Sequence, residues 1–135
     1  MISKLNIAVL FVYLFFFSIE IFSADNSVGQ ENIRQAIEQG AKFLYQNQNA
    51  TGWWTDSKLP ALTGLALVAL ETANVSELDE KYESERRRAY DYLVSLAKPD
   101  GSIHDGRLIN YNTACSLMAL SVSGDRDYNL SLIHI

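Results

Sequence analysis

Apolar and polar positions in the first half of the chain follow a helical period. Small or apolar residues recur at spacings of four, three and four, which predicts an amphipathic helix over about residues 30–46. These residues are Ile33, Ile37, Gly40 and Leu44. The polar stretch 48–59 predicts a long loop, and Pro60 suits the first turn of a following helix. Residues 62–70 are apolar on every side, so we expect that helix to be buried all round.

The same order of patterns follows in the second half. The polar stretch 76–81 is expected to link the halves, and the segment 83–96 predicts a second amphipathic helix. Its apolar face consists of Ala89, Tyr92, Leu93 and Leu96. We expect its basic cluster, 86–88, to lie on a solvated face beside two glutamates. Lys98-Pro99-Asp100-Gly101 predicts a turn, and residues 113–122 are again apolar nearly all round.

No segment of the chain alternates with the period of a β-strand, so the sequence predicts an all-α fold. A wholly apolar helix that alternates with an amphipathic one implies two layers. The apolar helices form the inner layer, and the amphipathic helices cover it with their charged faces in water.

The two halves also match at a fixed period. Two pairs of similar residues are 49 positions apart, namely Phe43 with Tyr92 and Gly52 with Gly101. Two later pairs are 50 positions apart, namely Thr63 with Thr113 and Leu70 with Leu120. Such a period predicts repeats that bury their apolar faces against each other. We expect a domain over 24–128 with repeats at about 30–72 and 82–122.

The first 23 residues have the layout of a secretory signal peptide. Lys4 precedes an uncharged apolar run over 7–17, and the small residues Ser23 and Ala24 follow. We therefore expect export to the periplasm or the medium, with cleavage after Ser23. The alternative is an uncleaved membrane anchor, although the run is shorter than the ~20 residues of a spanning helix.

Composition and charge narrow the classes of function. The hydrophobic content of 48% and charged content of 20% are those of a globular protein. The net charge of −5 disfavours nucleic acid as a partner, since an acidic domain repels phosphates. A single cysteine cannot form an internal disulfide, so the fold must be held by packing.

One segment of the first repeat carries a more specific motif. Gly40-Ala41-Lys42-Phe43-Leu44, then Gln48, then Gly52-Trp53-Trp54 resembles the QW motif of squalene and hopene cyclases. The second repeat resembles its start in Arg88-Ala89-Tyr90-Asp91-Tyr92-Leu93, with Ala97 in place of the Gln and Ile103 in place of the Trp. Tyr111-Asn112-Thr113-Ala114 also resembles bacterial prenyltransferase and squalene-oxidase repeat proteins.

The resemblance implies an α/α toroid, of which this chain holds about two helix pairs. It also implies structural roles for the motif residues Gly40, Phe43, Leu44, Gln48, Gly52, Trp54 and Gly101. An amide at Gln48 is expected to bond exposed backbone groups at the end of the helix and to lie against an indole face. Gly52 then allows a tight turn, and Trp54 packs over the helix end.

Residues that would carry the chemistry of such families are missing from the sequence. It has no Asp-x-Asp-Asp run, and Asp125-Arg126-Asp127-Tyr128 is expected to be a solvated turn. Cys115 lacks the neighbours of a zinc ligand or a thioester cysteine, so we expect a small buried side chain there. Neither a catalytic residue nor a metal or cofactor is assigned. The candidate ligand contacts are Trp53, Asp100, His104 and Asp105, all in the helix-to-helix loops.

The last residues, 129–135, carry no repeat pattern and resemble read-through of a sequencing adapter, so we expect the natural C-terminus to lie beyond them. Three functions stay open. The first is the N-terminal part of an exported, non-catalytic module that binds or scaffolds an apolar, glycan or protein partner. The second is a terpene cyclase-like enzyme, and the third is an exported polysaccharide-active enzyme. Contact with a membrane is expected only through an uncleaved signal segment.

Overall fold

A computed structural model describes residues 28–124 and residue 128. The described residues form helices and loops without a strand, which confirms the all-α prediction; Ala97 and Ile103 form one isolated β-bridge. The signal segment 1–23 and the tail 129–135 lie outside the described residues. Within those described, no helix combines the length and the hydropathy needed to cross a membrane.

The chain divides into two compact units, residues 1–37 and residues 38–135. In the first unit, residues 28–37 are helical and expose Val28, Ile33 and Ile37. The second unit holds the remaining helices. They are the helical residues up to 46, then α2 (Pro60–Ala73), α3 (Ser76–Lys81), α4 (Glu83–Ser95) and α5 (Ile109–Val122).

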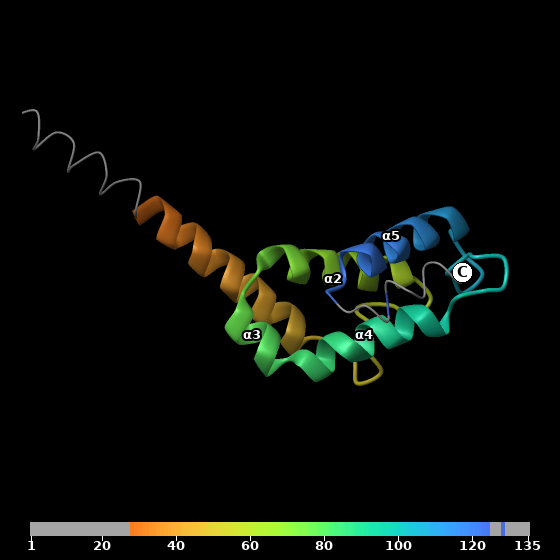
Figure 1. Ribbon diagram of the computed structural model, residues 1–135, viewed down its shortest axis with the longest axis horizontal. Coiled ribbons are helices and arrows are strands. Elements are labelled where there is room, and N and C mark those ends of the chain that lie inside the picture. The colour runs from red at the N-terminus through yellow and green to blue at the C-terminus, as the bar shows by residue number, and fades with distance from the viewer. Residues whose placement is uncertain (1–27, 125–127, 129–135) are drawn as a thin grey trace, which may run out of the picture. The chain divides into compact units, whose positions relative to one another are not determined.

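The two apolar helices, α2 and α5, lie side by side, and α2 also packs against α4 (Figure 1). Pro60 opens α2 as expected, and its fixed φ suits a first helical turn. Asn74 ends α2 in the left-handed conformation, which a short polar side chain tolerates. The two predicted apolar helices thus pack on each other, and the amphipathic helix α4 packs on α2.

The contact between α2 and α5 is unusually close at Gly64. A Cβ added there would lie 2.6 Å from the carbonyl oxygen of Cys115, so only glycine allows the two backbones to approach this far. Cys115 itself is buried, as expected. The core that forms around this contact consists mainly of Leu67, Leu70, Ala89, Tyr90, Leu93, Ala119 and Leu120.

The predicted apolar face of the first helix is wrong except at Leu44, which is half-buried and packs against the core. Ile33, Ile37 and Gly40 are exposed, whereas Ala41 and Tyr45 are buried. Tyr45 determines this rotation in the second unit, because its ring stacks on Tyr82 at 4.7 Å and its hydroxyl donates to Asp79 at 2.9 Å. A tyrosine with partners for both its ring and its hydroxyl outweighs a simple apolar stripe.

The segment 76–81, expected to link the halves, is the short helix α3 between α2 and α4. One further expectation about the helices is corrected. Neither apolar helix is buried all round, because Leu65 and Ala69 are exposed on α2, and Tyr111 and Met118 on α5. Each helix is covered on only some sides, and the remaining side of each is left to water.

Candidate functional site

Trp54 connects the first loop, residues 47–59, to the end of the helix before it. The side chain is 5% exposed, and its indole N–H donates to the carbonyl of Leu44 at 2.8 Å. That carbonyl belongs to the last turn of the helix, where backbone acceptors lack helical partners. The indole therefore caps the helix and fills the core below the loop.

Gln48 and Gly52 dock the same loop onto α4. The Gln48 amide donates to the carbonyl of Glu85 on α4 at 2.8 Å and to that of Gly52 at 3.1 Å. Gly52 has a φ of 102°, and an added Cβ would clash with the carbonyl of Arg88. Sequence reasoning expected the Gln48 amide to bond backbone groups at the end of its own helix. Its two hydrogen bonds instead reach the loop at Gly52 and the next amphipathic helix, α4.

A hydrogen bond between a loop and the helix after it occurs in both halves of the chain. The N–H of Trp54 donates to the hydroxyl of Thr63 at 3.2 Å. The N–H of Ile103 donates to the hydroxyl of Thr113 at 3.0 Å. The two N–H donors are 49 positions apart and the two hydroxyl acceptors are 50 positions apart. Ile103 is buried, as is its counterpart Trp54. The two threonines of the sequence pattern hold the loops against α2 and α5.

Each loop also contains a tight turn that a short polar side chain closes. In the first, the Asn49 side chain accepts the N–H of Thr51 at 2.9 Å. In the second, Asp100 accepts the N–H of Ser102 at 3.0 Å, and Gly101 has a φ of 85°. Both are short polar side chains that close a turn on their own backbone.

The four candidate ligand contacts do not form one cluster of free polar groups. The Asp100 carboxylate accepts hydrogen bonds from the N–H and the hydroxyl of Ser102. The Nδ1 of His104 accepts the N–H of Gly106 at 2.8 Å. Asp105 is exposed, and Trp53 is half-buried. The two paired side chains shape the second loop itself, which is an ordinary structural use of such residues.

An ion pair between the loops was not predicted. Arg107 in the second loop, residues 96–108, lies 3.2 Å from Asp56 in the first. The hydrogen bond from the Lys58 backbone N–H lowers the pKa of Asp56, and the hydrogen bond and charge of Arg107 lower it further. Nearby on α4, burial and then the charges of Asp105 and Asp56 raise the pKa of Tyr92 to about 12. Its hydroxyl donates to the carbonyl of Ser57 at 2.7 Å.

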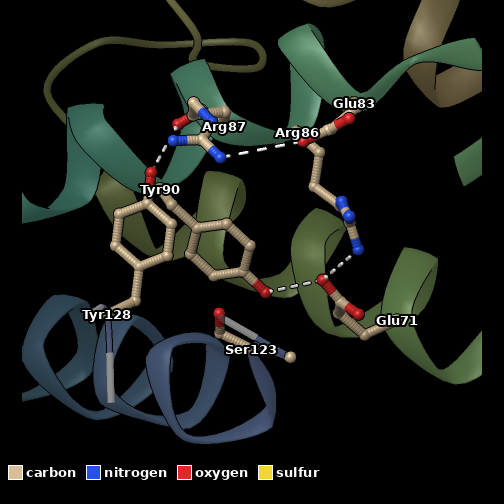
Figure 2. Close-up of a pocket in the computed structure, with 8 residues that line it drawn as sticks. Glu71, Glu83, Arg86, Arg87, Tyr90, Ser123 and Tyr128 are labelled. Carbon is tan, nitrogen blue, oxygen red and sulfur yellow. Dashed lines mark hydrogen bonds and ion pairs between the residues drawn. The ribbon is translucent and has the colours of Figure 1, made fainter. Parts of the chain in front are cut away.

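A cavity of about 440 Å³ opens between α4 and the ends of α2 and α5 (Figure 2). It is lined by Glu71, Glu83, Arg86, Arg87, Tyr90, Ser123, Gly124 and Tyr128. The rings of Tyr90 and Tyr128 stack at 4.9 Å and form one wall. Sequence reasoning missed this cavity, because its residues come from distant segments and match no motif.

Glu71 is the centre of the polar network in this cavity. Its Oε1 accepts the hydroxyl of Tyr90 at 3.0 Å and pairs with Arg86 at 3.3 Å. Burial, and then the Glu71 carboxylate, raises the pKa of Tyr90 well above its usual value. The prediction that the whole basic cluster is solvated is wrong for Arg86, because its guanidinium turns inward to Glu71. The other two arginines pair with glutamates of their own helix.

No three His, Cys, Asp or Glu side chains gather as metal ligands anywhere in the described part of the chain. Residues 125–127 of the expected solvated turn lie outside that part, as does His134. The last residue of that turn, Tyr128, is buried against Tyr90, so the expectation of a solvated side chain is wrong there. Set against models of protein families, curated proteins and solved structures, the chain matches none of them. The function must therefore be argued from its own packing.

Proposed function

We propose that this chain is a non-catalytic binding or scaffolding module made of α/α-toroid repeats, of the prenyltransferase and squalene-oxidase repeat type. The module presents a rigid layer of apolar helices to another macromolecule. The N-terminal segment 1–23 directs its export. Of the motif residues, Gln48, Gly52 and Trp54 then act as structural fasteners and not as catalytic groups, whereas Gly40 and Phe43 are exposed.

The observation that carries this proposal is the recurrence of one anchoring contact in both halves. The hydroxyls of Thr63 and Thr113 each accept a backbone N–H from the preceding loop. Such contacts hold α2 and α5 in equivalent positions, as neighbouring units of a repeat array require. Repeat arrays bind through the extended surfaces that their stacked units create.

An exposed side on each of the two helices supplies a surface for binding. Leu65 on α2 and Met118 on α5 are large apolar side chains that remain in contact with water. Exposed apolar patches on soluble domains commonly mark interaction sites. The polar cavity around Glu71 is a weaker candidate, because its carboxylate and its arginine already satisfy each other.

An accessibility experiment tests the proposal. The purified chain should enhance the fluorescence of an apolar dye such as anilinonaphthalene sulfonate, and Leu65→Glu and Met118→Glu should each reduce that signal. Far-ultraviolet circular dichroism should be unchanged, since both side chains are exposed. Dye binding that neither variant affects would contradict an open apolar surface. Turnover of squalene or of a soluble polysaccharide by the chain would contradict a non-catalytic role.

A further inference from the structure

The contact between α2 and α5 is made by a defined side of each helix. The N–H of Ala61 on α2 donates to the side chain of Asn112 on α5 at 3.1 Å. One turn further along, Gly64 lies against the backbone of Cys115. Positions 61 and 64 of α2 therefore face positions 112 and 115 of α5, so on this side of α2 facing positions are 51 places apart.

Equivalent positions of α2 and α5 are 50 residues apart, so the side of α2 that faces α5 has a counterpart on α5. Positions 61, 64 and 68 of α2 correspond to Tyr111, Ala114 and Met118. All three are exposed: Ala61 is 0% exposed, but its counterpart Tyr111 is 48% exposed. We call these three residues the α5 flank. It is the side of α5 that corresponds to the covered side of α2.

The same comparison in the other direction identifies the uncovered side of α2. Positions 112, 115 and 119 of α5, on the side that faces α2, correspond to Leu62, Leu65 and Ala69, which we call the α2 flank. Cys115 is 8% exposed, whereas its counterpart Leu65 is 40% exposed. Ala69 is exposed and Leu62 half-buried. Both flanks are uncharged and have apolar residues at their centres.

We infer that a second copy of this chain docks head to tail, with the α2 flank of one copy on the α5 flank of the other. The internal contact supplies the template, because the same offset of 50 residues relates covered to uncovered positions on both helices. In this arrangement Met118 packs beside Ala69 of the second copy, and Ala114 beside its Leu65. This inference rests on the proposed function and names its first partner.

The contact between copies is looser than the internal one. Ala114 stands where the internal contact has Gly64, so an extra methyl group separates the helices. Leu62 stands where the internal contact has Asn112, so the N–H at the start of α5 gains no cap from the second copy. The association is therefore reversible and concentration-dependent.

The two flanks differ from each other, so the contact is not two-fold symmetric. A head-to-tail contact leaves one flank of each kind open at the ends, and further copies add until a ring closes or a filament grows. The net charge of −5 opposes the approach of copies, so salt should strengthen the association by screening.

Sedimentation velocity on three versions of the chain tests the inference. The unmodified chain should form oligomers that grow with concentration. Leu65→Glu and Met118→Glu, which each block one flank, should be monomeric alone. An equimolar mixture of the two variants should form a dimer and nothing larger, because each variant keeps the flank that the other lacks. Phe43→Glu replaces a residue that is 63% exposed on another helix and should behave as the unmodified chain.

Three results would overturn the inference. They are a monomeric unmodified chain, a mixture that stays monomeric, and oligomers that survive Leu65→Glu. The last would indicate symmetric pairing through the α5 flank alone. A monomer that still binds the apolar dye at both flanks would refute the second copy as the partner and leave the proposed function standing.

Discussion

The side chain of Asn112, at the start of α5, caps the start of α2 by accepting the N–H of Ala61 at 3.1 Å. Its amide N–H₂ donates to the carbonyl of Arg107 at 2.7 Å, so both ends of the buried amide are used. One side chain thus joins the second loop, α5 and α2. It replaces the capping side chain that the residue before α2, Leu59, cannot provide.

Replacing Asn112 by alanine should lower the free energy of unfolding by about 2 kcal/mol, since a helix cap and a buried hydrogen bond are lost together. Chemical denaturation measures this change. Asn110→Ala is the matched control, because Asn110 is exposed and lies two positions earlier in the first turn of α5. Equal losses in the two variants would show that the capping contact has no special value.

Two glycines in helices should respond in opposite directions to alanine. Gly64→Ala forces α2 and α5 apart, because the new Cβ meets the Cys115 carbonyl at 2.6 Å, and should cost about 1–3 kcal/mol. Gly40→Ala adds a methyl group with no atom within 4 Å and should stabilise by about 0.5–1 kcal/mol through helix propensity. Thermal melts of both variants measure the difference. A stabilising Gly64→Ala would contradict the close contact.

The two adjacent tryptophans should differ strongly. Trp54→Ala removes a buried indole and its hydrogen bond to Leu44, and should cost about 3–5 kcal/mol. Trp53→Ala should cost clearly less, because its side chain is only half-buried. Denaturation of the two variants under identical conditions decides the matter. A larger loss at Trp53 would mean that the structural role belongs to the other indole.

Alkaline pH should weaken the fold, and Tyr92 should contribute to the loss between pH 10 and about 12. Its pKa is raised in the folded state from 10.0 to about 12, first by burial and then by the nearby carboxylates. The folded state thus favours the neutral phenol, so its stabilisation is complete below pH 10 and is lost as the pH rises towards 12. Tyr92→Phe should reduce this dependence, and a slope still intact in that variant would contradict it. Tyr111→Phe, at an exposed tyrosine, serves as the control.

Export should be visible in the mature N-terminus. A bacterium that expresses the chain should place it outside the cytoplasm, and its first residue should be Ala24 or Asp25. The reason is the uncharged run 7–17 followed by small residues. N-terminal sequencing of the purified protein measures this directly. Soluble cytoplasmic protein that begins at Met1 would rule out the signal peptide.

Local pattern was enough to predict the all-α class and most features of the helices. Helical periodicity places α2, α4 and α5 close to their observed bounds, and Pro60 marks the start of α2. Gly101 was predicted to lie in a turn, and its N–H does donate to the carbonyl of Lys98. These features depend on neighbours within one or two turns of the chain, so a sequence contains them.

The candidate site was harder to predict, because its contacts join distant segments. Nothing in the sequence near Arg86 indicates that it turns inward while Arg87 is exposed. Its partner Glu71 lies on another helix. Asp56 and Arg107 likewise meet only because two loops lie side by side. Side-chain direction on a charged helix is decided by what packs against it.

The sequence by itself determined that this protein is built of alternating amphipathic and apolar helices, with matched residues 49 and 50 positions apart. The tertiary structure alone decided which sides of the apolar helices are covered. Leu65 and Cys115 occupy equivalent positions, but only Cys115 has a neighbouring helix over it. A hydrophobic pattern records that a side chain favours burial, whereas the presence of a covering surface depends on where the other helices lie.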